Sequence, residues 1–144
     1  MTVRDRAWAD EEVRAIGACG DDCGFCPRYV ATASGDPGEL EKVKDLWVRL
    51  GWRDRAFPAQ SLACHGCGPR NDCAYPELRD CVRGRAVARC GLCPDYPCAL
   101  TTALFARSDH LRLHARQVCT HAEMTALDQA FFSKRLNMER TQTA

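Results

Sequence analysis

Cysteine constrains this chain more than any other residue type. The sequence of 144 residues contains 11 cysteines, and three pairs have the Cys-x2-Cys spacing: Cys23/Cys26, Cys64/Cys67 and Cys90/Cys93. Two intervening residues allow a tight turn, or knuckle, that points both sulfur atoms at one ion. Several such pairs within one short stretch indicate that the chain binds metal through thiolates.

Disulfide bonds are the weaker explanation for these cysteines. The segment from Met1 to Trp8 has charges of both signs and no apolar run, which is unlike a secretory signal peptide. We therefore expect a cytoplasmic protein in a reducing compartment, where structural disulfides are rare. No apolar run approaches the roughly 18 residues that a membrane span needs, so we expect no membrane association.

The sequence allows two arrangements of the ligands. In one, Cys81, Cys90, Cys93 and Cys98 form a tetrahedral site, while Cys64, Cys67 and Cys73 take a fourth ligand from the N-terminal cluster or from a histidine. In the other, Cys64, Cys67, Cys90 and Cys93 form a ribbon-like site. The predicted metal ligands are Cys19, Cys23, Cys26, Cys64, Cys67, Cys73, Cys81, Cys90, Cys93 and Cys98. The predicted cofactor is Zn²⁺, with two ions per chain.

The N-terminal triplet has a second interpretation. Cys19, Cys23 and Cys26 have the Cys-x3-Cys-x2-Cys spacing that resembles the cluster motif of radical S-adenosylmethionine enzymes. Three thiolates would leave one iron of a [4Fe–4S] cluster open to a substrate. Those enzymes carry the motif on a large α/β barrel, and this chain has neither the length nor the alternating strands and helices. Structural zinc is therefore the preferred prediction, with iron or an iron–sulfur cluster as the alternative.

The order of these residues resembles a known family. The pattern runs through Cys19-Gly20-x2-Cys23-x2-Cys26-Pro27-x-Tyr29-x-Ala31-Thr32, the helix ending at Leu50-Gly51, Cys64-x2-Cys67, Cys73, Cys81 and Cys90-x2-Cys93-Pro94-x-Tyr96-Pro97-Cys98. It is similar to domain of unknown function 3795, a cysteine-rich family of bacteria and archaea regarded as zinc proteins without an established activity. The resemblance covers about 19 to 100, and it implies metal binding but no reaction.

One position departs from that family pattern. The family commonly has a cysteine three residues after the one at 73, and this chain has Pro76 there. The resemblance therefore implies that one site has lost a ligand. Either a histidine or cysteine from elsewhere replaces it, the candidates being His65, His114, Cys119 and His121, or that site is weak or empty.

The apolar pattern predicts a single domain over 1–144 that is mainly α-helical, with irregular loops nucleated by metal. We expect helices at 5–17, 37–50, 98–106, 109–118 and 122–138. Asp36 and Ser108 are the expected N-caps of the second and fourth helices. The cysteine-rich region, about 19–98, has zinc-knuckle or zinc-ribbon character, and a short hairpin could accompany it. Residues 58–98 of this region have too few apolar residues to form a core of their own. The C-terminal helices follow over about 98–140.

We interpret two groups of residues outside the cysteine pattern as structural and not as functional sites. His110 and His114 would share one face of a helix, but no HExxH motif is present, so we interpret them as incidental residues of a solvent-facing helix. Arg79, Arg83, Arg85 and Arg89 are expected to offset thiolate charge and to form local hydrogen bonds.

Charge and motifs narrow the predicted function. The formal charge is +1, and two zinc ions with four thiolates each would change it to about −3, which disfavours a nucleic-acid partner. The sequence has no GxSxG, Walker A or GxGxxG pattern, so we do not expect an enzyme. The predicted function is a zinc-binding scaffold or interaction module with another protein as its partner. The alternative is a small iron–sulfur, thiol-redox or metal-sensing protein.

Overall fold

A computed structural model describes residues 17–65, 74–87 and 89–142, and this part of the chain is helical without β-strands. Its elements are η1 (Cys23–Phe25), α2 (Pro27–Ser34), α3 (Pro37–Leu50), η2 (Ala59–Leu62), α4 (Pro76–Gly84), η3 (Cys90–Leu92), α5 (Ala99–Val118), α6 (His121–Ala130) and α7 (Lys134–Gln142). The prediction of a mainly helical fold is confirmed. The suggested hairpin does not occur in the described ranges.

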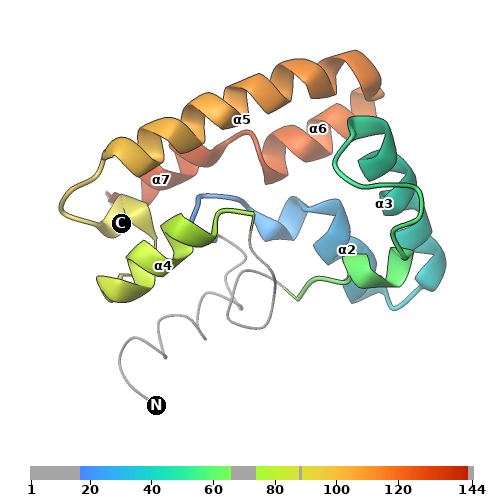
Figure 1. The fold of residues 1–144 in the computed structure, drawn as a ribbon, viewed down its shortest axis with the longest axis horizontal. Coiled ribbons are helices and arrows are strands. Elements are labelled where there is room, and N and C mark those ends of the chain that lie inside the picture. Colours follow the sequence, from blue (N-terminus) through green and yellow to red (C-terminus); the bar gives the residue numbers. More distant parts are fainter. Residues whose placement is uncertain (1–16, 66–73, 88, 143–144) are drawn as a thin grey trace.

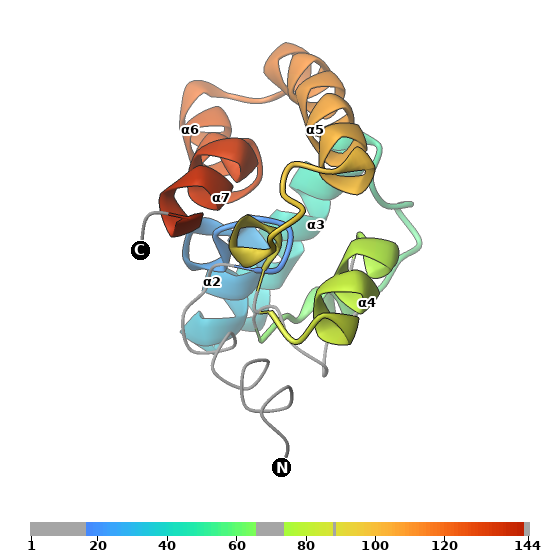
Figure 2. The same cartoon turned by 90° about the vertical axis from the view of Figure 1, so that its left-hand side faces the viewer.

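Helix α5 extends along one side of the molecule, with α6 and α7 beneath it (Figure 1). Helices α3 and α4 lie toward opposite ends, and α2 lies between them (Figures 1 and 2). The long helix α5 therefore connects the two ends of the fold.

Two apolar clusters stabilise these two ends. The first contains residues of α2, α3, η2, α5 and α6, and Leu62 and Leu127 are completely buried in it. The second contains residues of the 18–19 loop, α4, η3, α5 and α7, with Met138 completely buried. Helix α5 contributes Ala115 to the first cluster and Phe105 to the second.

Local sequence signals explain α3 well. The Asp36 Oδ1 accepts a hydrogen bond from the Gly38 backbone N–H at 2.9 Å, and Pro37 occupies the first turn. Gly51 ends the helix with a φ of +78°, a left-handed conformation that glycine adopts readily. The predicted helix at 37–50 and its cap are confirmed.

The boundaries of the C-terminal helices were predicted wrongly. The expected helices at 98–106 and 109–118 are one continuous helix, α5, and the expected helix at 122–138 is divided into α6 and α7. Ser108 is not a cap, because it is buried inside α5 and its Oγ donates to the Phe131 carbonyl at 3.2 Å. That contact and the Ser133 Oγ donating to the Asp128 carbonyl at 2.8 Å stabilise the turn between α6 and α7.

The cysteine-rich region contains more structure than expected. Helices α2 and α4 were not predicted, and α4 buries Leu78 and Val82 in the second cluster. Residues of 58–98 thus pack in a cluster that they share with α5 and α7. Pro76 is in the first turn of α4, where its missing N–H costs nothing. The predicted helix at 5–17 lies almost wholly outside the described residues.

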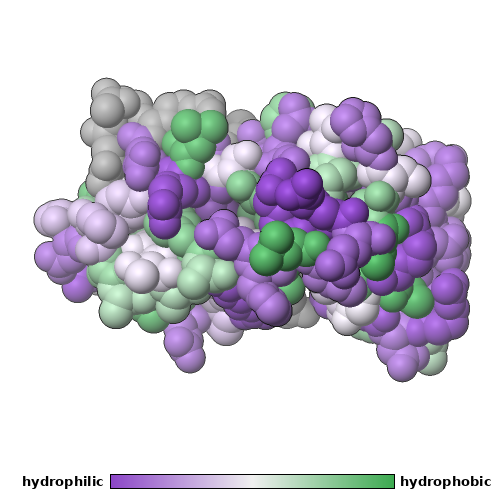
Figure 3. Space-filling model, turned by 90° about the horizontal axis from the view of Figure 1, so that it is seen from above, coloured by the Kyte–Doolittle hydropathy of each residue, from purple (hydrophilic) through white to green (hydrophobic). Residues whose placement is uncertain are grey.

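The surface over α5 is a mixture of residue types. Seen from that side, hydrophobic side chains form separate groups among hydrophilic ones (Figure 3). Leu113 is the most exposed large hydrophobic residue of α5, at 61%. In the part of the chain that the structure describes, no helix combines the length and apolarity needed to cross a bilayer.

Candidate functional site

Two of the Cys-x2-Cys pairs form the tight turns that their spacing predicts. In each, the first three residues make a turn of 3-10 helix, η1 and η3. The Cys26 N–H donates to the Cys23 carbonyl at 3.1 Å, and the Cys93 N–H donates to the Cys90 carbonyl at 2.9 Å. Both knuckles are thus local structures. Cys67 of the third pair, and Cys73, lie outside the described residues.

Four thiols from three elements surround one small cavity. Cys81 comes from α4, Cys90 and Cys93 from the η3 knuckle, and Cys98 from the N-terminus of α5. The cavity has a volume of about 40 Å³. These are the residues of the first predicted arrangement, and Cys64 of the ribbon-like alternative lines a different cavity. We name this group the four-thiol cluster.

The four thiols influence one another electrostatically. Burial, followed by the neighbouring Cys98, Cys81 and Cys93, raises the pKa of the Cys90 thiol to about 12. Cys98 is the N-cap of α5, and the backbone N–H of Thr101 lowers the pKa of its thiol. The Nη1 of Arg85 contacts the Cys93 sulfur at 3.6 Å. The arginines at 79, 83, 85 and 89 were expected to form local hydrogen bonds near the thiolates, and Arg85 makes such a contact.

The four-thiol cluster has the right donor atoms for Zn²⁺, but its sulfurs are not gathered at one point. Within 17–65, 74–87 and 89–142, no group of three or more histidine, cysteine, aspartate or glutamate side chains is arranged to hold a metal ion. Zn–S bonds of about 2.3 Å require the four sulfurs to lie about 3.8 Å apart. Zinc binding at this cluster therefore requires the four sulfurs to come closer together than they are in this structure.

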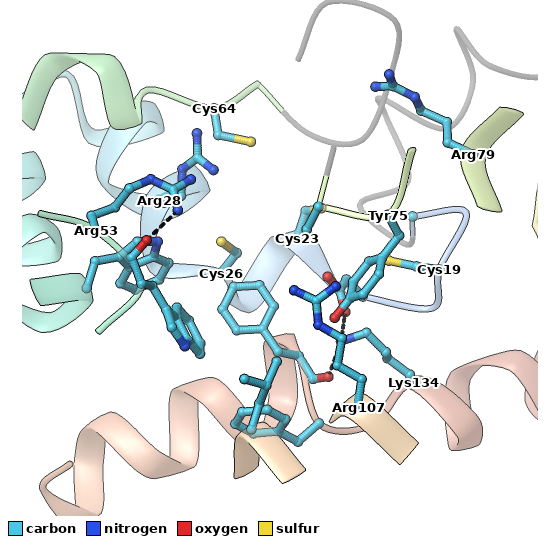
Figure 4. A pocket seen from close by; sticks show the side chains of 18 of the residues that line it. Cys19, Cys23, Cys26, Arg28, Arg53, Cys64, Tyr75, Arg79, Arg107 and Lys134 are labelled. Carbon is cyan, nitrogen blue, oxygen red and sulfur yellow. Dashed lines mark hydrogen bonds and ion pairs between the residues drawn. The ribbon is translucent and has the colours of Figure 1, made fainter. Parts of the chain in front are cut away.

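The other described candidate ligands line a second, larger cavity of about 450 Å³. Cys19, Cys23, Cys26 and Cys64 all lie on its wall (Figure 4). Burial raises the pKa of the Cys26 thiol to about 11, and the nearby Cys64 contributes to the increase. The Cys64 backbone N–H donates to the Thr32 Oγ1 at 2.9 Å, which attaches this segment to α2. The structure therefore places the N-terminal triplet and Cys64 on the wall of one cavity.

Basic side chains line the same large cavity, and no sequence pattern predicts them as a group. Arg28, Arg53, Arg79, Arg107 and Lys134 come from five segments that are distant in sequence. Arg79 belongs to the arginine stretch that was expected to offset thiolate charge, and it lines this cavity together with Cys19, Cys23, Cys26 and Cys64. No local motif connects the five residues, because only tertiary packing brings them together.

Lys134 anchors one side of the large cavity. Its Nζ lies 2.6 Å from the Asp21 Oδ1 and donates to the Phe131 carbonyl at 2.6 Å. Burial acts to lower the pKa of this ammonium, but Asp21, Cys19 and Tyr75 together outweigh burial, and the pKa is raised. Lys134 therefore stays cationic, although its side chain is only 3% exposed.

The histidine candidates lie apart from both cavities. The His114 Nε2 is 3.1 Å from the Leu50 carbonyl, where it joins α5 to the end of α3. Cys119 follows α5 as its C-cap, and His121 begins α6. His65 and His110 are exposed, and neither is among the described residues that line the cavities.

The fold and cavities define a small helical protein with cysteine knuckles. The chain belongs to the family described as protein of unknown function (DUF3795), whose model matches residues 15–103. No curated protein and no solved structure matches the chain. The family match includes both knuckles and the start of α5.

Proposed function

We propose that this protein is a zinc-binding scaffold in which the four-thiol cluster holds a structural Zn²⁺. The observation that supports this most strongly is the convergence of Cys81, Cys90, Cys93 and Cys98 on one small cavity. Four thiolates are a common ligand set for structural zinc. An ion there would join α4, η3 and α5, and its binding free energy would contribute to folding.

A second Zn²⁺ belongs to the proposal. Its four ligands would be drawn from six candidates. These are Cys19, Cys23, Cys26 and Cys64, which line the large cavity, and Cys67 and Cys73. The electrostatic interaction between Cys26 and Cys64 supports a ligand set shared between the N-terminal triplet and the middle of the chain. The cytoplasmic location and the protein partner expected from the sequence remain part of the same proposal.

Metal analysis tests the proposal directly. Untagged protein purified without oxygen should contain two zinc ions per chain, show no visible absorbance, and give Zn–S distances of about 2.3 Å by X-ray absorption. Cys93→Ser should lose one zinc ion. Cys119→Ser is the matched control, because Cys119 is not among the described residues that line either cavity, and it should retain both ions.

The same samples separate the alternatives. Circular dichroism on both variants verifies that each is folded before its zinc is counted. Full zinc content in Cys93→Ser, or no metal in the wild type, would contradict the proposal. Iron with visible absorbance would instead favour an iron–sulfur cluster at Cys19, Cys23 and Cys26. Release of one metal on mild oxidation would favour a thiol-based sensor.

A further inference from the structure

The large cavity has the properties of a small-molecule binding site. Its volume of about 450 Å³ lies within the range of about 300–1,000 Å³ that is typical of ligand pockets. Aromatic and aliphatic side chains form much of the wall, among them Trp52, Leu111, Phe131 and Phe132. A wall of this kind accommodates an apolar or aromatic body.

The charge of the cavity wall differs sharply from that of the whole chain. The described wall contains five cationic side chains and one carboxylate, Asp21, which is paired with Lys134. The wall therefore has a net charge of about +4, whereas the whole chain has a formal charge of +1. If a zinc ion with four thiolates were also present on this wall, about +2 would remain.

The cations lie on two sides of the cavity (Figure 4). Arg28 and Arg53 lie on the side of Cys64, and Arg107 and Lys134 lie on the side of Cys19 and Tyr75. The Arg28 Nε donates to the Leu62 carbonyl at 2.8 Å, which fixes the base of its guanidinium group. The guanidinium carbon of Arg107 and the ammonium of Lys134 each lie 5.3 Å from the Tyr75 ring centroid.

Positive charges that line one cavity repel one another, and a bound anion reduces that repulsion. Guanidinium groups bind carboxylate and phosphate oxygens through paired N–H donors. We propose that the large cavity binds a small organic anion, with its apolar body against the aromatic wall and its acidic group among the arginines. This site shares its cavity with the proposed second zinc site, but it uses the basic side chains of the wall and not the thiols.

A pair of fluorescent probes tests the site with the intact, metal-loaded protein. 8-Anilinonaphthalene-1-sulfonate has an aromatic body and a sulfonate, and N-phenyl-1-naphthylamine has the same body without the charge. The anionic probe should bind about tenfold more tightly, because only its acidic group can contact the guanidinium groups. Energy transfer from Trp47 and Trp52, which both line the cavity, should accompany its binding.

Two variants on one helix locate the bound anion. Arg107→Gln should weaken binding of the anionic probe about tenfold and change binding of the neutral probe less than twofold. Arg116→Gln removes the same charge from an exposed position of α5 outside the cavity, and it should leave both affinities within twofold. The variants are compared after verifying equal zinc content, so that loss of metal is not mistaken for loss of the anion site.

Competition identifies the acidic group. Displacement of the anionic probe by phenyl phosphate at lower concentrations than by benzoate assigns a phosphate-type ligand, and the reverse order assigns a carboxylate. Equal affinity of the two fluorescent probes, or equal effects of Arg107→Gln and Arg116→Gln, would overturn the proposal. Either result would mean that the probe binds apolar surface without using the cavity cations.

Discussion

Gly20 holds the backbone next to Cys19 tightly against α7. Its φ is +87°, and a Cβ atom at this position would lie 2.7 Å from the Lys134 carbonyl oxygen. The Gly20 carbonyl also accepts a hydrogen bond from the buried Asn137 Nδ2 at 2.8 Å. A single residue without a side chain therefore allows the loop that carries Cys19 to contact α7.

We expect Gly20→Ala to lower the free energy of unfolding by about 2–4 kcal/mol, because it combines a strained φ with a backbone overlap. Urea denaturation measures the change. Gly51→Ala is the matched control, because Gly51 has a φ of +78° but open space around the position of a Cβ atom. The control should cost only about 1 kcal/mol. Equal losses in the two variants would show that the close approach to Lys134 contributes nothing.

At the scale of elements, Arg49 and Glu123 connect three helices. Arg49 of α3 donates through its Nη1 to the Val118 carbonyl at the end of α5, at 3.1 Å, and to the Glu123 Oε1 in α6, at 3.0 Å. Glu123 also accepts from the Thr120 N–H at 2.8 Å, completing a capping box with the Thr120 side chain. The hydrogen bond from Arg49 is the main cause of the decrease in the pKa of Glu123 to about 2.

Glu123→Gln should destabilise the protein by about 1 kcal/mol at neutral pH, since it removes a charged cap and a partly exposed ion pair. The pKa of Glu123 is lower in the folded chain than its ordinary value of 4.5, so its stabilising effect is complete above that pH. The effect should decrease as the pH falls from about 4.5 to 2. Urea denaturation of wild type and variant at several pH values checks this.

The exposed Glu41 of α3 provides the comparison for that experiment. Glu41→Gln removes the same charge, and we expect a change within about 0.5 kcal/mol. A difference between wild type and Glu123→Gln that stays constant down to pH 2 would contradict the assigned role of the Glu123 carboxylate.

At the scale of the whole molecule, the two apolar clusters differ in their relation to the four-thiol cluster. The first cluster, around α3 and α6, contains aliphatic residues and the edge-to-face pair Trp47 and Trp52, whose ring centroids are 5.2 Å apart. The second cluster is smaller and includes Cys90 of the four-thiol cluster. If the four-thiol cluster holds zinc as proposed, the end of the fold that contains the second cluster should therefore depend more strongly on zinc for its stability.

Removal of zinc by a chelator should accelerate amide hydrogen exchange in α4, η3 and the first turn of α5. Exchange in α3 and α6 should change much less, because their packing does not include the four-thiol cluster. Hydrogen-exchange mass spectrometry of the holo and chelated protein measures both regions at once. Uniform acceleration along the chain would show instead that the two ends unfold as one unit.

The sequence by itself determined the features that depend on neighbouring residues. The Asp36 cap and the stop at Gly51 determine α3, and the two-residue spacing determines the knuckles at Cys23 and Cys90. These structures form from contacts within a few residues, so a sequence pattern is sufficient to predict them. The list of candidate thiols also followed from spacing alone.

Tertiary structure decided which of these features meet. Ser108 has the residue type of an N-cap, but its contact with Phe131 places it inside α5. Cys81 and Cys98 line one cavity, and Arg28 and Lys134 line the other, because the packing of the fold brings together helices that are distant in the sequence. Such contacts are stabilised by burial in the two clusters, which no local pattern records. The sequence therefore indicated thiolate chemistry, whereas only the packed fold produced the basic cavity.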